Sequence, residues 1–122
     1  MSFDKSLESE IKNILSQGPI AGLAGGEELM SSTGDTFDVK DPGSGEKLAE
    51  VHNLQAEDVD RAVELAGQAF ENAEWAGLPV NERCVYLHRL ADEVENRKPL
   101  ISHLESMDCG KILVQAEDDV QN

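Results

Sequence analysis

Residues 34–52 read GDTFDVKDPGSGEKLAEVH, and this stretch decides the fold class. Apolar and polar side chains alternate in two short runs, which predicts the strands Thr36–Lys40 and Lys47–His52. Between the runs, Pro42 presets the backbone angle of a turn, and the glycines beside it accept positive φ. The stretch therefore predicts an antiparallel β-hairpin with a five-residue connection, residues 41–45.

Helical periodicity of apolar residues dominates the rest of the chain. Apolar side chains recur at the spacing that puts them on one face of a helix. The apolar face begun in the last of these segments is expected to continue beyond it. The pattern predicts four helices and the start of a fifth, over residues 3–16, 56–72, 81–96, 99–108 and 112–122.

Residues that begin and end helices support these boundaries. Asn81 is the predicted N-cap of the third helix, and Gly110 is placed to end the fourth in the left-handed conformation. Cys84 falls on the apolar face of the third helix, so we expect a buried thiol. The apolar faces of the second and third helices are expected to pack partly on each other.

Residues 18–35 are rich in Gly, Ser and Thr, which predicts a loop with a short strand around Glu28–Met30. A phosphate-binding glycine turn follows a strand and opens a helix. Gly22, Gly25 and Gly26 follow no convincing strand and open no helix. We therefore predict no cofactor-binding residue in this chain.

The charge of the chain excludes some classes of partner. Its 25 acidic and 10 basic residues give a formal net charge of −15 over 122 residues. Such a surface repels nucleic-acid phosphates and anionic membrane surfaces, so we expect neither as a partner. A solvated acidic surface is the plain interpretation, and a docking site for a basic partner is the alternative.

Cysteine content and hydropathy indicate the compartment. Two cysteines do not form a disulfide framework. No apolar run has the length of a membrane span, and the charged N-terminus has no signal-peptide core. We expect a reducing, cytoplasmic setting.

Five motifs, in order and with matching spacing over about residues 26–120, resemble the aldehyde dehydrogenase superfamily. The sequence departs from the family's pattern at four places. Asp41 and Cys109 stand where the family usually has Asn, Ile112 stands where it has Pro, and the family's F-I-x-G strand is missing before Glu27. Residues 36–46 match the family's hairpin motif T-F-x-x-x-N-P-x-T-G-E, and residues 56–63 match its first large helix. Ala69-Phe70 and Trp75 stand where the family has A-F and W. Residues 82–92 match E-R-x-x-x-L-x-x-L-A-D, and residues 104–111 match L-E-x-x-D-x-G-K.

The resemblance implies an α/β fold. The chain would be the N-terminal part of the aldehyde dehydrogenase fold, with a β-hairpin and several amphipathic helices, incomplete without the rest of the Rossmann-like domain. Residues 1–25 would form an N-terminal helix and loop. Residues 26–122 would form the N-terminal part of the cofactor-binding domain.

The resemblance also implies an activity for the complete enzyme. Members of the family oxidise aldehydes to carboxylic acids with NAD or NADP, through a cysteine thiohemiacetal and a glutamate general base. The family's nucleophile, base and oxyanion asparagine all lie beyond the part that this chain matches. We therefore predict no catalytic residue here, no binding of NAD or NADP to this chain, and an inactive isolated polypeptide.

The cysteines and histidines support no other chemistry. A buried Cys84 would be inert, and Cys109 lies at a helix C-terminus, whose negative dipole end opposes thiolate formation. His52, His88 and His103 have no metal-ligand spacing with one another or with the cysteines.

One site carries over by resemblance alone. Several aldehyde dehydrogenases hold a structural monovalent cation near the first hairpin and the Asp of L-E-x-x-D. The matching positions are Val39 and Lys40, through backbone carbonyls, and Asp108. Asp108 as a solvated residue near a helix end is the alternative.

Two functions remain after these exclusions, since five motifs in order argue against a third, an unrelated small acidic helical protein. The first is an N-terminal portion of an aldehyde dehydrogenase, whose partners would be an aldehyde and further copies in a homo-oligomer. The second is a non-catalytic acidic module that docks on a partner or on a full-length relative. Incomplete apolar faces favour association in either case.

Overall fold

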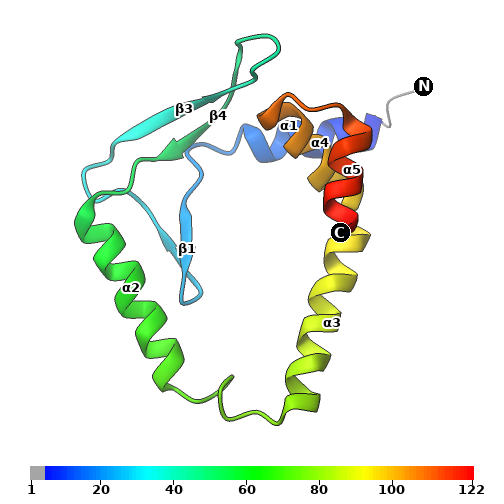
Figure 1. Cartoon of the computed structure of the whole chain (residues 1–122). Coiled ribbons are helices and arrows are strands. Elements are labelled where there is room, and N and C mark those ends of the chain that lie inside the picture. The colour runs from blue at the N-terminus through cyan, green and yellow to red at the C-terminus, as the bar shows by residue number, and fades with distance from the viewer. Residues whose placement is uncertain (1–4) are drawn as a thin grey trace.

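The computed structural model describes residues 5–122 and arranges them as an open frame (Figure 1). Three helices gather at one end beside a long hairpin, and two further helices run away from that end as separate arms joined by a loop. The elements in chain order are α1 Lys5–Leu15, β1 Gly22–Ala24, β2 Glu27–Leu29, β3 Thr36–Lys40, β4 Lys47–His52, α2 Ala56–Glu71, α3 Val80–Asn96, α4 Lys98–Cys109 and α5 Leu113–Gln121.

The β3–β4 hairpin has the two strands that the sequence predicts. It pairs Thr36 with His52 and Val39 with Ala49, antiparallel. Its connection has six residues, 41–46, so the predicted five-residue connection is wrong. Glu46 belongs to the turn because its carbonyl oxygen accepts a hydrogen bond from the Asp41 N–H at 2.9 Å.

A second hairpin, β1–β2, occupies most of the predicted loop. Gly25 and Gly26 connect its strands, with φ of +59° and +82°, and Leu23 pairs with Glu28 across it. Two successive residues with positive φ are the preferred connection of a tight hairpin. The expectation that no strand precedes Glu27 is therefore wrong, because a Gly-Gly turn allows the chain to fold back there.

The segment before β1 adds a short third strand to the long hairpin. The Ile20 N–H donates to the Glu50 carbonyl at 2.7 Å, and the His52 N–H donates to the Ile20 carbonyl at 3.0 Å. This parallel bridge between Ile20 and Val51 joins β4 to the chain that leaves α1. It thereby fixes the position of the hairpin relative to α1.

Helix α2 is held by the β1–β2 hairpin. Leu65 is buried on the face of α2 that meets the hairpin. A Cβ built on Gly25 would lie only 3.1 Å from the Leu65 Cβ, so the turn approaches the helix closely. Arg61 adds an exposed ion pair to Glu27 of β2, with 3.6 Å between nitrogen and oxygen.

The packed core of the frame lies among α1, α4 and α5. Ile11 of α1, Leu100 of α4 and Ala116 of α5 are buried, and Ala116 is fully so. Small side chains at the contact let helices approach closely, and Ser102 of α4 is also fully buried. Helix α4 ends at Gly110 in the left-handed conformation, with φ of +69°, as the sequence predicts.

Helix α3 begins earlier than the sequence predicts. Its N-cap is Pro79, whose carbonyl accepts hydrogen bonds from the N–H groups of Glu82 and Arg83 at 3.0 and 3.1 Å. The predicted N-cap, Asn81, therefore lies inside the helix. The predicted start of the first helix at Phe3 lies outside the described residues.

The predicted packing of α2 on α3 is wrong. Figure 1 shows the two helices on opposite sides of the frame. Helix α3 has no buried residue, and Cys84 is exposed, so the buried thiol is wrong too. The apolar pattern does mark one face of α3, but only its C-terminal end near Val94 meets α5, and the part around Cys84 and Leu87 is exposed.

Candidate functional site

A pocket of about 440 Å³ lies between the end of α1, the β3–β4 hairpin and α4. Its walls are mainly apolar, and acidic side chains stand on the α4 side. The lining residues are Leu15, Ile20, Val39, Leu48, Ala49, Val51, Ile101, Leu104, Glu105, Met107 and Asp108.

The pocket brings together two of the three residues of the predicted cation site. Val39 and Asp108 both line it, whereas Lys40 is not among its lining residues. The hairpin turn also touches the end of α4, because a Cβ built on Gly110 would lie 2.7 Å from the Pro42 Cγ. The hairpin and the end of α4 are therefore neighbours, as a shared site requires.

The backbone at Val39 and Lys40 departs from a regular strand ladder. The pairing register shifts between these residues, and Leu48 of β4 is the extra residue. Such a bulge leaves backbone groups outside the regular hydrogen bonding. Hard cations prefer oxygen ligands of this kind together with a carboxylate, and Asp108 is a carboxylate that lines the same pocket.

The side chains of residues 5–122 form no metal centre by themselves. No group of three His, Cys, Asp or Glu in this part of the chain lies close enough to hold a metal ion. A cation between Val39 and Asp108 would therefore depend on backbone carbonyls and on ligands from elsewhere.

Lys111 joins α4 to α5 beside the pocket. Its Nζ lies 2.5 Å from Glu105 Oε1 and 2.6 Å from Asp119 Oδ2. Hydrogen bonds to Asp119 and then to Glu105 raise the pKa of the Lys111 ammonium above its ordinary value. The Ser106 hydroxyl also donates to the Lys111 carbonyl at 2.7 Å. The Glu105 carboxylate is thus already ion-paired with the Lys111 ammonium.

The hairpin turn shows why Asp replaces Asn at position 41. Asp41 Oδ1 accepts the Gly43 N–H at 2.6 Å, and Asp41 Oδ2 accepts the Ser44 hydroxyl at 3.0 Å. The Gly43 N–H and then the Ser44 hydroxyl lower the pKa of the Asp41 carboxyl. An ionised carboxylate fixes this turn in the way that an Asn amide oxygen would.

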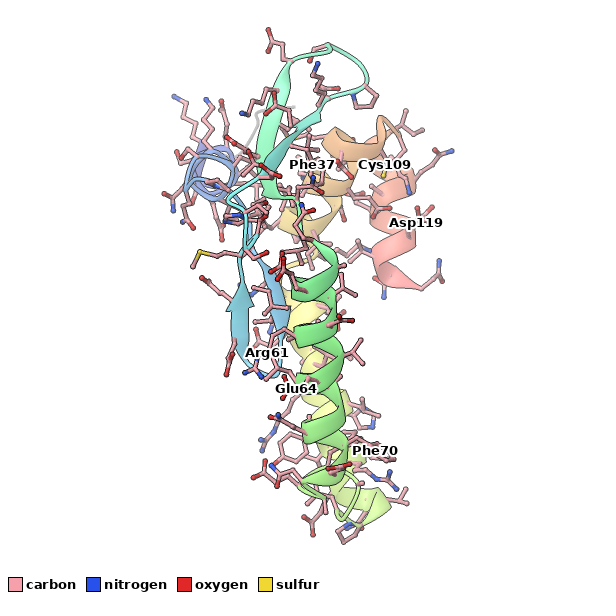
Figure 2. The ribbon with its side chains drawn as sticks, turned by 90° about the vertical axis from the view of Figure 1, so that its left-hand side faces the viewer. Phe37, Arg61, Glu64, Phe70, Cys109 and Asp119 are labelled. Atoms are coloured by element: carbon pink, nitrogen blue, oxygen red, sulfur yellow. The ribbon has the colours of Figure 1, made fainter. Side chains whose placement is uncertain are left out.

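The cysteines and histidines of the described residues belong to no group that could hold a metal ion. Cys109 is exposed and ends α4, and Figure 2 shows it close to the start of α5. His103 Nδ1 lies 2.7 Å from the Pro99 carbonyl on its own helix. His52 lies in β4 and His88 lies in α3.

A sequence profile described as the aldehyde dehydrogenase family matches residues 29–122. The chain belongs to the aldehyde dehydrogenase family. The match covers more than half of the chain and includes the hairpin and helices α2 to α5.

Named relatives and a solved structure agree with this assignment. The chain is 34% identical over 110 residues to cytosolic 10-formyltetrahydrofolate dehydrogenase of Xenopus tropicalis, covering 90% of this chain and 12% of that protein. It is 38% identical over 106 residues to mitochondrial benzaldehyde dehydrogenase of Antirrhinum majus, covering 87% and 20%. Betaine aldehyde dehydrogenase of Staphylococcus aureus in complex with NAD+ superposes with a TM-score of 0.86 at 26% identity, covering 94% and 23%.

This aldehyde dehydrogenase chain thus spans between an eighth and a quarter of the proteins that it matches. The structure is the N-terminal portion of the aldehyde dehydrogenase fold, in which helices and two antiparallel hairpins are combined. No helix of residues 5–122 is long and apolar enough to cross a membrane.

Neither the β1–β2 turn nor the start of α2 fits the pyrophosphate of a nicotinamide cofactor. A phosphate cradle needs a glycine turn that opens a helix with free N–H groups. Gly25 and Gly26 instead form the β1–β2 turn. Helix α2, which follows β4, has a carboxylate at its start, because Asp58 Oδ2 accepts a hydrogen bond from the Gln55 N–H at 2.7 Å. That helix start already holds a negative charge, which repels phosphate.

Sequence reasoning missed the contacts that tie distant segments together. Asp58 follows Gln55 by three residues, a spacing at which a side chain reaches back to the start of its helix, so a search for caps would have found it. The Lys111 contacts had no comparable signal, because Glu105 and Asp119 approach Lys111 only through the turn at Gly110.

Proposed function

We propose that this chain is the scaffold-forming N-terminal part of an NAD(P)+-dependent aldehyde dehydrogenase and that it contributes no reacting group. The complete enzyme would oxidise an aldehyde to a carboxylic acid through a cysteine thiohemiacetal. The observation that supports this division is the superposition of nearly the whole chain on about a quarter of a NAD+-bound betaine aldehyde dehydrogenase.

The role of this part follows from its geometry. The β3–β4 hairpin, α1 and α4 are tied together through Ile20, Pro42 and Gly110. The start of α2 lies beside this hairpin, and the end of α3 lies beside α4 (Figure 1). The contacts therefore hold the start of α2 and the end of α3 at fixed positions on the frame. We expect the remaining domain to build its cofactor site against this frame, with all nicotinamide contacts made by later residues.

The division at residue 25 and the compartment stay predictions. We propose that residues 26–122 belong to the cofactor-binding domain and that residues 1–25 precede it. We also propose a cytoplasmic location, as the name of the cytosolic relative from Xenopus tropicalis indicates for that protein.

Titration with NAD+ tests the proposal on the chain itself. We expect no saturable heat of binding at millimolar NAD+ by isothermal calorimetry, because the helix start that follows β4 is already occupied by Asp58. Saturable binding in the micromolar range would overturn the assignment of every cofactor contact to other residues.

A structural monovalent cation at Val39, Lys40 and Asp108 is a second part of the proposal. The shared pocket of Val39 and Asp108 and the bulge at Val39–Lys40 support it. We expect the melting temperature in potassium or sodium chloride to exceed that in tetramethylammonium chloride of equal ionic strength. D108N should abolish the difference, whereas D118N, which changes an exposed Asp of α5, should keep it. Equal melting temperatures in all three salts for the unaltered chain would refute the cation site.

A further inference from the structure

A second carboxylate lines the pocket of the proposed cation site. Glu105 and Asp108 both belong to the walls of the pocket of about 440 Å³ between the hairpin and α4. They lie three residues apart, so they share one side of the helix. Two carboxylates together with backbone carbonyls are the ligands that Ca²⁺ takes, and its affinity depends on how many of its ligands are charged. By residue type alone, the pocket would therefore favour a divalent cation.

Lys111 compensates the charge of one of these two carboxylates. Its Nζ lies 2.5 Å from Glu105 Oε1, and the two side chains are only 27% and 28% exposed. An ion pair that is largely shielded from water is stronger than one at the surface. Among residues 5–122, no lysine, arginine or histidine forms an ion pair with Asp108. The pocket is thus left with one uncompensated carboxylate.

Asp119, the second partner of Lys111, lies outside the pocket. It belongs to α5, where Figure 2 labels it, and it is not among the lining residues of the pocket. Its carboxylate lies 2.6 Å from the Lys111 Nζ and is 55% exposed, so water screens much of its charge. Lys111 therefore neutralises the carboxylate that lines the pocket, and its contact with Asp119 helps to hold the ammonium there.

The turn after α4 determines where the Lys111 side chain lies. Gly110 ends the helix in the left-handed conformation, and the Ser106 hydroxyl then donates to the Lys111 carbonyl at 2.7 Å. The backbone of Lys111 is therefore tied to the last turns of the helix that carries Glu105 and Asp108. Two side-chain contacts and one backbone contact place this lysine, which distinguishes it from a solvated surface lysine.

We propose that Lys111 makes the pocket selective for a monovalent cation, because it withholds Glu105 from the site. This inference rests on the cation site at Val39, Lys40 and Asp108 proposed above. While Glu105 is ion-paired, a divalent ion would leave one positive charge unbalanced among apolar side chains, which is unfavourable. Without Lys111, the carboxylates of Glu105 and Asp108 together would balance a divalent ion.

Thermal melts in calcium chloride test the role of Lys111. The calcium response is the rise in melting temperature when calcium replaces tetramethylammonium at equal ionic strength, with calcium at about 5 mM, above the dissociation constants of weak protein sites. K111M removes the charge and keeps the length of the side chain. Its calcium response should exceed that of the unaltered chain by at least about 4 °C. Equal responses would overturn the proposal, and K111Q serves if K111M does not fold.

K98M is the matched control, because Lys98 also joins α4 to α5. The Lys98 Nζ donates to Gln121 Oε1 at 2.9 Å, which involves no carboxylate of the pocket. K98M should loosen α5 but leave Glu105 paired, so its calcium response should equal that of the unaltered chain. A response in K98M as large as that in K111M would contradict the proposal, since loosening of α5 would then be what admits calcium.

Two double variants locate the bound calcium. K111M/E105Q lacks the released carboxylate and should lose the added calcium response. K111M/D119N should keep the response, because Asp119 does not line the pocket. The reverse pattern would place calcium against α5, where the ammonium had been, and would refute the proposal. Circular dichroism at the same concentration establishes that each variant is folded.

The unaltered chain and D108N give a test that needs no change at Lys111. Calcium should raise both melting temperatures equally, because it then acts only on the acidic surface that the two chains share. A calcium response that D108N reduces would overturn the selectivity. Absence of a potassium response in the unaltered chain would instead refute the cation site itself, so failure of the site and failure of the role of Lys111 are distinguishable.

Discussion

Asp58 ties the first turn of α2 to the loop before β3. Its carboxylate accepts the Gln55 N–H at 2.7 Å and the Ser32 N–H at 3.1 and 3.2 Å to its two oxygens. The Gln55 and Ser32 backbone N–H groups lower the pKa of the Asp58 carboxyl. One side chain therefore caps a helix and anchors a segment 26 residues earlier.

A lowered pKa at Asp58 predicts a pH dependence of stability. The ionised carboxylate is favoured in the folded state, so its contribution is present above the unfolded pKa of about 4 and is lost as pH falls through the folded pKa. D58N should lower the melting temperature at pH 7 and have little effect at strongly acid pH. Thermal melts across pH measure the difference between the two chains.

D60N is the control for that series, because Asp60 is an exposed Asp of the same helix. It should change the melting temperature little at any pH. A D58N effect that stays constant from pH 7 into strongly acid solution would show that ionisation of Asp58 is not the source of its contribution.

The β1–β2 turn allows a matched comparison of two glycines. Gly25 and Gly26 both have positive φ, which costs an L residue about 1 kcal/mol. Only Gly25 also lies against Leu65, whereas a Cβ on Gly26 meets nothing within 4 Å. G25A should therefore lower the free energy of unfolding by about 2 kcal/mol and G26A by about 1 kcal/mol. Urea denaturation measures both, and an equal loss would contradict the close approach of the turn to α2.

At the scale of elements, Lys111 holds α5 against α4. Its ammonium lies between one carboxylate from each helix. K111M should free α5, because Glu105 and Asp119 would then repel each other. Hydrogen exchange should quicken at the amides of residues 113–121 and stay slow in the buried part of α4 around Leu100.

K5M is the matched control, since Lys5 is an exposed lysine on α1. It should leave exchange in α5 unchanged. Equal protection of α5 in the unaltered chain and in K111M would show that packing of Ala116 alone holds the helix.

Secondary structure was predictable where local chemistry determines it. Strands β3 and β4 follow from alternation around the turn at Pro42, and the end of α4 follows from Gly110. The β1–β2 hairpin could also have been found, since Gly25-Gly26 is a strong turn signal. Asn81 was a poor guide to the start of α3, because the Pro79 carbonyl already accepts the first helical hydrogen bonds.

Burial was predicted less well than helicity. The apolar pattern around Cys84 marks a face that packs on something, and it does not say on what. Within residues 5–122 only the C-terminal end of that face meets another helix, α5, and Cys84 is exposed. For the candidate site, the family resemblance indicated Val39 and Asp108, which line one pocket. The Lys111 contacts depend on the path of the chain after Gly110, and no local pattern encodes them.

At the scale of the whole molecule, an acidic frame carries two long helices with uncovered apolar faces. The core among α1, α4 and α5 is small, and α3 buries no residue. Stability of such a chain depends on what covers the arms. The chain superposes over 94% of its length on 23% of a betaine aldehyde dehydrogenase, which supports the proposal that it builds the frame of the enzyme.

The most direct test of this account is the formation of reduced nicotinamide by the purified 122-residue chain. NAD+ or NADP+ and an aldehyde are supplied, and absorbance of the reduced cofactor is followed, with a preparation from cells lacking the gene as the control. The account predicts the same rate in both samples. A rate that scales with the amount of this chain and is absent from the control would contradict the claim that its residues only build the frame.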